Sequence, residues 1–153
     1  MPAMPAVVPA AVVQTLDQMV EINRNGYSLD EEGQCLATAV YFESRGEPLQ
    51  GQLAVADVVL NRASSGRYPT SLCAVVKQKA QFSFVRGGGR FPSIDPDCPE
   101  WARAQAIARI AQSKLATAVP TDVLWYHADY VAPSWGRRLT RVDKIGAHIF
   151  YRA

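Results

Sequence analysis

One carboxylate in the sequence stands where it could carry acid chemistry. Glu43 follows Val40 by three residues and Leu36 by seven, so on a helix it shares a face with side chains that must enter the core. Burial disfavours the charged form of a carboxyl group and raises its pKa, and the negative end of a helix dipole acts in the same direction. A carboxyl group that keeps its proton near neutral pH can act as a general acid. The structural alternative is a salt bridge from Glu43 to Arg45 or Arg62.

The elements that must position Glu43 are helices. Ser28 stands three residues before Glu31, which is the spacing of a capping box and predicts a helix start just before the Glu43 segment. Pro48 is typical of the first turn of the helix that follows. Apolar spacing and breaker residues predict helices over about residues 10–23, 28–44, 48–64, 72–77 and 100–118.

The rest of the chain contains turns and short extended pieces. Residues 86–99 hold three glycines and three prolines, so we expect a long loop there. The aromatic pieces VLWYH and HIFY are expected to be extended. The sequence therefore predicts a mainly α fold of the α+β kind, a helical core with short extended segments that line a cleft.

Length and composition indicate one globular domain. The 153 residues include 48% hydrophobic and 20% charged residues, which is typical of a folded protein. We expect a lead-in with one helix over residues 1–27 and the functional domain over residues 28–153. A net charge of +2 is too weak to indicate nucleic-acid binding, and no apolar run is long enough to span a membrane. The opening MPAMPAVVPAAVV lacks a charged start, so no intact secretory signal is expected in it.

Several separate motifs carry a resemblance to a known family. These motifs are, in order, AVYFESRGEPLQGQLAVADVVLNR, YPTSLCAVV, QFSF, YHADYVAPSW and IGAHIFYR. Together they resemble the SleB-type (spore cortex-lytic) cell wall hydrolases from about Cys35 to Arg152. The resemblance implies a lysozyme-like fold related to the lytic transglycosylases. It also implies that Glu43, in the segment Tyr-x-Glu-x-Arg-Gly-Glu, is the catalytic acid.

The resemblance predicts the substrate, the partners and the location of the protein. We expect cleavage of peptidoglycan glycan strands between N-acetylmuramic acid and N-acetylglucosamine, without a metal or other cofactor. The expected partner is the glycan strand rather than nucleic acid, and the expected state is a monomer. The expected location is the cell envelope, either periplasmic or secreted.

A glycosidase usually needs a second carboxylate, and the sequence offers no obvious one. Glu47 is interpreted as a residue that accepts backbone N–H groups at the start of the next helix. Asp57 is interpreted as a buried structural group bonded to Asn61, rather than as a second catalytic acid. Enzymes of the lytic transglycosylase type lack a second acid, because one glutamate first protonates the glycosidic oxygen and then removes a proton from the sugar's own hydroxyl. Sequence spacing leaves ring closure and attack by water both open.

Two groups of residues are predicted to bind the substrate. In the first, Gln81 and Ser83 share one face of an extended piece and Phe82 the other, which suits either a cleft wall or an ordinary core strand. In the second, Tyr126 and His127 match the Tyr-His pair of the family, and Trp135 stands nearby in an aromatic cluster that could instead be core. Resemblance favours the binding role for both groups.

The three cysteines allow at most one internal disulfide. Relatives often have a cysteine before the QFSF motif, whereas this chain has Ala80. A replacement pair of Cys73 with Cys35 or Cys98 is one possibility, and three unpaired thiols are the other.

Two other functions are considered beside glycan cleavage. A zinc amidase that cuts the bond between sugar and peptide could use His127, Asp129 and His148, but the sequence has only two histidines and no HExxH motif. A non-catalytic module that binds the wall through the same cleft is the third hypothesis.

Overall fold

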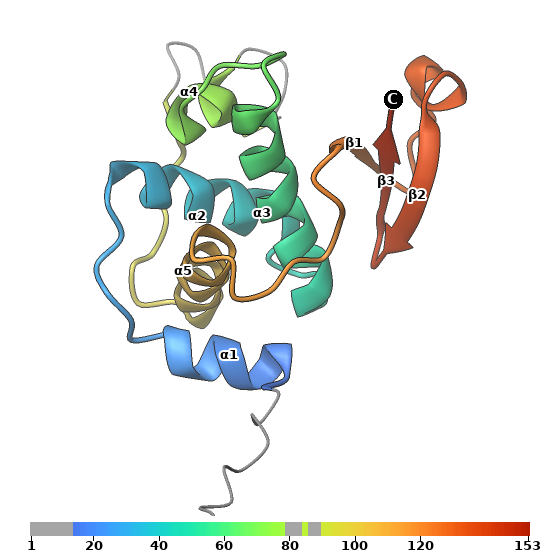
Figure 1. The fold of residues 1–153 in the computed structure, drawn as a ribbon. Helices are drawn as coiled ribbons and strands as arrows, with labels where there is room; N and C mark the ends of the chain where they lie inside the picture. The colour runs from blue at the N-terminus through green and yellow to red at the C-terminus, as the bar shows by residue number, and fades with distance from the viewer. Residues whose placement is uncertain (1–13, 79–83, 86–89) are drawn as a thin grey trace, which may run out of the picture.

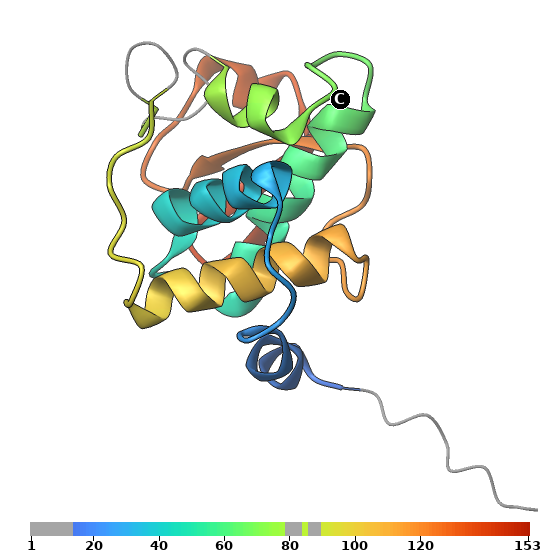
Figure 2. The same ribbon diagram turned by 90° about the vertical axis from the view of Figure 1, so that its left-hand side faces the viewer.

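The computed structural model describes residues 14–78, 84–85 and 90–153. In chain order the elements are α1 (Leu16–Asn23), α2 (Glu31–Ser44), α3 (Leu49–Ser64), α4 (Leu72–Lys77), α5 (Pro99–Gln112), β1 (Val123–Ala128), the 3-10 helix η1 (Ser134–Arg137), β2 (Thr140–Ile145) and β3 (His148–Arg152). Helix α3 stands between the other helices and the three-stranded sheet (Figures 1 and 2). The mainly helical α+β class predicted from the sequence is confirmed.

Side-chain caps fix the starts of α1, α2 and α4, and the cap of α2 differs from the prediction. Asp30, rather than Ser28, caps α2, because its carboxylate accepts the backbone N–H of Gly33 at 2.8 Å. Thr15 and Gln18 form a capping box at the start of α1, so the described part of this helix begins later than the predicted residue 10. Pro48 is the N-cap of α3 and therefore precedes its first turn.

Helix α5 ends six residues earlier than the sequence predicts. Lys114 adopts a left-handed conformation with φ of 55°. The N–H of Lys114 then donates to the carbonyl of Ala111, and the N–H of Leu115 donates to that of Ile110. These two bonds form a Schellman motif, which closes the helix at Gln112. A glycine usually occupies the left-handed position, so this end was not recognisable from residue types.

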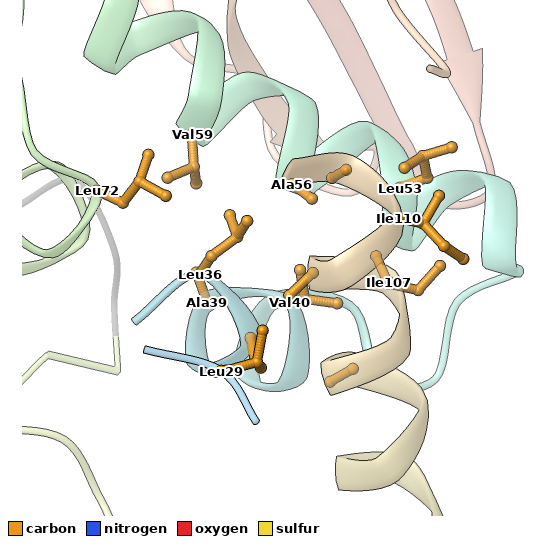
Figure 3. Close-up of a cluster of buried hydrophobic side chains, with 14 of the residues drawn as sticks. Leu29, Leu36, Ala39, Val40, Leu53, Ala56, Val59, Leu72, Ile107 and Ile110 are labelled. Atoms are coloured by element: carbon orange, nitrogen blue, oxygen red, sulfur yellow. The ribbon is translucent and has the colours of Figure 1, made fainter. Parts of the chain in front are cut away.

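The hydrophobic core lies where α2, α3 and α5 meet (Figure 3). Leu36 and Val40 of α2 are fully buried there against Leu53 of α3 and Ile107 of α5. Burying one such side chain contributes about 1.5 to 3 kcal/mol. The apolar face predicted to precede Glu43 is therefore buried, and it fixes the rotation of α2 about its axis.

The sheet packs on the other side of α3 and has the strand order β1-β3-β2, with both pairs antiparallel. Tyr126 of β1 is paired with Phe150 of β3, whose ring is buried against Ala54 and Val58 of α3. Since neighbouring side chains on a strand point to opposite faces, Tyr126 faces α3 and His127 faces away from it. We call these the inner and the outer face of the sheet.

A disulfide joins two of the helices. Cys35 of α2 and Cys73 of α4 are bonded, with 5.1 Å between their Cα atoms, and Cys98 is free. Of the possibilities left open by the sequence, the structure therefore contains the pair of Cys73 with Cys35. No helix in the described part of the chain has the length and apolar character that a bilayer span requires.

Candidate active site

Glu43 lies in the last turn of α2, where its side chain is half-buried. Burial raises the pKa of its carboxyl group above the ordinary value, and this effect is larger than two opposing ones. A hydrogen bond from the Tyr126 hydroxyl and the positive charge of Arg62 both lower the pKa. The net result is a carboxyl group biased toward its protonated form, as predicted from the sequence.

Tyr126 reaches Glu43 from the inner face of the sheet. Its ring packs against those of His148 and Phe150, with ring centroids 5.1 and 5.5 Å away. Burial raises the pKa of the Tyr126 hydroxyl well above its ordinary value, and the nearby Glu43 carboxylate adds to this. Tyr126 therefore keeps its proton near neutral pH, and its hydroxyl donates a hydrogen bond to Glu43.

Arg62 is the third member of this group and comes from α3. It is buried, its Nε donates to the carbonyl of Leu124 at 2.8 Å, and its guanidinium lies 4.9 Å from the ring centre of Tyr68. Asn61 donates to the carbonyls of Pro120 and Val123, both at 3.0 Å. These bonds tie the end of α3 to the start of β1, and so they place Tyr126 beside Glu43.

From the sequence, Arg62 was expected only as a possible salt-bridge partner of Glu43. Its place in the group that it forms with Glu43 and Tyr126 was not predicted. Arg62 shares the LAVADVVLNR run with buried apolar residues, which was the available signal. The other proposed partner, Arg45, stacks its guanidinium over the Tyr41 ring at 4.8 Å, so this cation is placed on an aromatic face.

Aromatic rings continue from Glu43 along one side. Phe42 precedes Glu43 on α2 and stacks on Phe84, with centroids 4.9 Å apart. The ring of Phe84 in turn packs against that of Phe91, with ring centroids 5.9 Å apart. Phe84 is the last residue of the QFSF motif, so this motif ends beside the carboxyl end of α2. The predicted binding residues Gln81, Phe82 and Ser83 lie outside the described residues.

The two acids that follow Glu43 in the sequence are bound elsewhere. Glu47 was predicted to accept backbone N–H groups at the start of α3, and this is wrong. Its carboxylate reaches the β2–β3 turn instead, where it accepts the N–H of Ala147 at 2.8 Å and lies 3.4 Å from Nδ1 of His148. Asp57 accepts the N–H groups of Ala118 and Val119 at 2.6 and 3.2 Å.

Asp57 therefore has the structural role expected of it, but its partner was predicted wrongly. Asn61 bonds instead to backbone carbonyls near β1. The backbone N–H groups of Ala118 and Val119 come from the connection after α5, whereas the sequence predicts a helix that continues to Ala118. Helical N–H groups would have been occupied, so this partner could not be anticipated.

Two further predicted binding residues lie apart from Glu43. His127 is on the outer face of the sheet, where its Nε2 is 2.8 Å from the Tyr151 hydroxyl. Trp135, from η1, packs edge-on against His127 with ring centroids 5.5 Å apart. The structure thus brings Tyr126 to Glu43 but places His127 and Trp135 together at a second location.

The zinc hypothesis finds no support in the geometry. His148 is buried on the inner face beside Tyr126, whereas His127 points to the outer face, so the two rings do not converge on one ion. Within the residues that the structure describes, no three His, Cys, Asp or Glu side chains gather in a metal-binding arrangement.

Fold and site together define a class of protein: a small helix-dominated α+β domain that holds one half-buried glutamate, whose pKa is raised by burial, beside a tyrosine and an arginine. The chain belongs to the cell wall hydrolase family, whose model matches residues 46–151. The resemblance seen in the sequence motifs is thereby confirmed. Glu43 lies just before the matched range, so its assignment rests on the site geometry and on the motif around it.

Individual relatives agree with the family. The chain is 34% identical over 128 residues to a spore cortex-lytic enzyme of Bacillus cereus and 34% identical over 134 residues to one of Bacillus subtilis. These alignments cover 82% and 86% of this chain but only 46% and 41% of the relatives. The chain thus spans less than half the length of these relatives.

Solved structures match over nearly their whole length. The catalytic domain of the germination-specific lytic transglycosylase SleB from Bacillus anthracis superposes with a TM-score of 0.68 at 32% identity, covering 84% of this chain and 98% of that domain. The catalytic domain of Bacillus cereus SleB gives a TM-score of 0.65 at 32% identity, with 84% and 94% covered. The chain therefore corresponds to the catalytic domain of these proteins.

Proposed function

We propose that this protein cleaves the glycan strands of peptidoglycan, between N-acetylmuramic acid and N-acetylglucosamine, with Glu43 as its acid. The observation that supports this most directly is the half-buried Glu43 carboxyl group, whose pKa is raised by burial and which Tyr126 hydrogen-bonds. Membership of the cell wall hydrolase family supports the substrate class. The solved relative described as a lytic transglycosylase supports the type of bond.

In the proposed reaction Glu43 gives its proton to the glycosidic oxygen, and the bond between this oxygen and the anomeric carbon breaks. Glu43 is then a carboxylate, which the Tyr126 hydroxyl and the Arg62 charge stabilise. The carboxylate next removes a proton from the hydroxyl that attacks the anomeric carbon. Glu43 ends the cycle protonated, so one residue serves as acid and then as base.

The attacking hydroxyl is proposed to be the sugar's own, which closes an anhydro ring. Glycosidases that direct a water molecule usually use a second carboxylate to activate it. Glu47 and Asp57 already accept backbone N–H groups of other segments, which supports a mechanism with one acid. Attack by water remains the alternative, and the products distinguish the two because hydrolysis leaves reducing ends.

The protein is proposed to act on the wall in the cell envelope, periplasmic or secreted. The curated relatives are spore cortex-lytic enzymes, and the cortex is wall material. Glu43, Tyr126 and Arg62 all come from one chain, which supports a monomer as the active unit. The net charge of +2 gives no reason to expect a nucleic-acid partner.

The test is digestion of purified peptidoglycan by the wild type and by Glu43→Gln, with product analysis by mass spectrometry. We expect anhydromuramic ends from the wild type, and a loss of at least about a hundredfold in rate for the variant. Circular dichroism and sedimentation with the wall should show that the variant is folded and bound. Freed peptides without cut glycan would indicate an amidase, and binding without turnover by the wild type would indicate a wall-binding module.

A further inference from the structure

The outer face of the sheet carries a cavity that the proposed reaction does not use. It has a volume of about 580 Å³ and lies between the sheet and the segment that connects β1 to η1. Its lining is half polar and half apolar and includes His127, Val131, Pro133, Arg137, Ile149 and Tyr151. Tyr126, which serves Glu43, points to the opposite face of the same strand, so this cavity is separate from the acid site.

One wall of the cavity is a preformed aromatic layer. The rings of His127 and Tyr151 are stacked with centroids 5.3 Å apart, and a hydrogen bond of 2.8 Å joins them. Trp135 does not line the cavity itself but packs edge-on against both rings, with ring centroids 5.5 and 5.4 Å away. Because each ring is held by the other two, this wall needs little ordering when a ligand binds.

The charge at the cavity is positive. Arg137 is exposed in its lining and forms no ion pair within the part of the chain that the structure describes. Asp129 also lines the cavity, but Lys144 lies 3.3 Å from its carboxylate and balances its charge. Arg141 is paired with Tyr151 across the sheet and therefore belongs to the same face. The cavity thus favours an anion, and a guanidinium fits a carboxylate best of all side chains.

The apolar half of the lining limits the kind of anion. Val131, Pro133 and Ile149 form a surface for small aliphatic groups, while the Ser134 hydroxyl offers a hydrogen bond. In intact peptidoglycan the lactyl carboxyl group of muramic acid is tied up in the amide to the peptide, so the sugars carry no free carboxylate wherever a stem is attached, whereas a short peptide rich in alanine offers both a free carboxylate and methyl groups. Peptidoglycan supplies such a peptide on its muramic acid units.

We propose that this cavity binds the peptide stem of peptidoglycan, with a stem carboxylate at Arg137 and alanine methyl groups against Val131 and Ile149. The choice of ligand rests on the proposed function, because it assumes that peptidoglycan is the substrate. The cavity holds the polymer through its peptides while Glu43 acts on its glycan. His127 accordingly belongs to substrate recognition at the peptide rather than at the cleaved bond, and Trp135 holds the His127 ring in place.

The test measures binding to two forms of the wall, both freed of phosphate-containing polymers. One is intact peptidoglycan, and the other is the same material after an amidase has removed its stems. All variants carry Glu43→Gln so that the wall is not digested. Arg137→Ala should weaken binding to the intact wall about tenfold and leave binding to the stem-free glycan unchanged. Arg138→Ala is the matched control, since it removes the same charge from the next residue, which does not line the cavity.

Equal weakening on both walls, or no weakening on either, overturns the peptide assignment. So does a loss that appears only when the phosphate-containing polymers are left on the wall, because the cavity would then bind those polymers. The proposed function is tested separately, by cleavage of the stem-free glycan by the protein with Glu43 intact. Failure of that cleavage refutes the glycan-cutting role whatever the binding comparison shows.

Discussion

The proton on Glu43 is controlled by three neighbouring features that do not act in the same direction. Burial raises the pKa of its carboxyl group, whereas the Tyr126 hydrogen bond and the Arg62 charge lower it. The last two stabilise the carboxylate form of Glu43. They therefore reduce the share of Glu43 that holds its proton before the reaction, and they stabilise the negative charge that develops when the proton is transferred.

Tyr126→Phe separates these effects. Without its hydroxyl, Glu43 loses a group that lowers its pKa, so the pKa should rise and the alkaline limb of the kcat/KM profile should move to higher pH. The developing carboxylate also loses a donor, so kcat should fall by roughly tenfold or more. Wall digestion measured across the pH range checks both effects. Tyr27→Phe is the control, since the Tyr27 hydroxyl contacts only Ser113 among the described residues. If the alkaline limb of Tyr126→Phe stays in place or moves to lower pH, this result contradicts the hydrogen bond from Tyr126 to Glu43.

Asp57 gives a second test at this scale, on stability. Burial raises its pKa from 3.8 to about 6, despite the N–H groups of Ala118 and Val119 that favour its charge. A raised pKa means that the folded state holds the proton more tightly than the unfolded state does. The stabilising effect is therefore complete below the unfolded pKa and is lost as pH rises through about 6.

Asp57→Asn should remove this loss. An asparagine keeps an oxygen acceptor for the backbone N–H groups but carries no charge to bury. We expect the variant and the wild type to be equally stable near pH 4, and the variant to be more stable by about 1 to 2 kcal/mol near pH 7. Urea unfolding at the two pH values checks this. Asp97→Asn, at an exposed acid, should show no such difference, and a variant that is less stable at pH 7 contradicts the sign.

At the scale of elements, Glu47 fastens the β2–β3 turn to the connection between α2 and α3. The turn contains Gly146 at φ of +58°, where an added Cβ would lie 3.0 Å from Glu47 Oε2, so a larger residue would push the two apart. Two residues after Gly146, His148 lies against both Glu47 and the Tyr126 ring. Glu47 therefore acts on the position of Tyr126 from a distance, through His148.

Glu47→Ala and Glu47→Gln distinguish this role from a simple effect of charge. Alanine removes the acceptor for the Ala147 N–H, so the free energy of unfolding should fall by about 1 to 3 kcal/mol. In Glu47→Ala the loosened Tyr126 should also move the alkaline limb of the kcat/KM profile to higher pH, as Tyr126→Phe does. Glutamine removes the charge but keeps an acceptor, and loss of a nearby negative charge alone would lower the pKa of Glu43.

The double variant Glu47→Ala with Tyr126→Phe completes this test. Its limb should coincide with that of Tyr126→Phe, because the two changes act through one hydroxyl. The limb is read from the same pH profile of wall digestion. If the shifts of the alkaline limb in the two single variants instead add up in the double variant, Glu47 does not act through Tyr126.

The same elements show how far the sequence could predict the fold. Apolar residues and helix breakers predicted α2, α3 and α4 well, because α2 and α3 are buried over most of their middle turns and the breakers mark where they end. Strand β2 was not predicted, since most of its side chains are exposed and its pairing with β3 determines it. The end of α5 depends on the left-handed Lys114, a conformation that its residue type does not signal.

The candidate site was predictable in part for similar reasons. Glu43 and Tyr126 were both predicted as site residues, and the structure brings them together. His127 was assigned to the same place as Tyr126 because the two are adjacent in a family motif, yet adjacent residues of a strand point to opposite faces. Arg62 joins the group only through the packing of α3 against β1, which is a contact between distant segments that no local pattern reveals.

At the scale of the whole molecule, α3 is the partition on which both functional surfaces depend. One side of α3 packs on α2 and holds the helix that ends in Glu43, and the other packs on the sheet that supplies Tyr126 (Figure 1). Seen from the side, the sheet lies behind the helices, so its outer face is turned away from them (Figure 2). The acid and the proposed peptide cavity thus lie on opposite faces of the same three strands.

The Cys35–Cys73 disulfide should stabilise this arrangement without taking part in the chemistry. It closes a loop of 38 residues that contains the end of α2 and all of α3, and closing a loop of this length in the unfolded chain stabilises the fold by about 3 to 4 kcal/mol. Cys35 is near the start of α2 and Glu43 near its end. Stability and activity should therefore respond differently to loss of the bond.

Reduction of the wild type should lower its Tm by roughly 6 to 12 °C for a chain of this size. Digestion of the wall at 25 °C should change little, because the core contacts of α2 with α3 and α5 persist. Calorimetry with and without a thiol reductant measures the shift. The double variant Cys35→Ala with Cys73→Ala should melt at the lower temperature and be insensitive to the reductant, and Cys98→Ala should behave as the wild type. A Tm that is the same in both redox states would mean that the native helix packing, and not the crosslink, already holds α4 against α2.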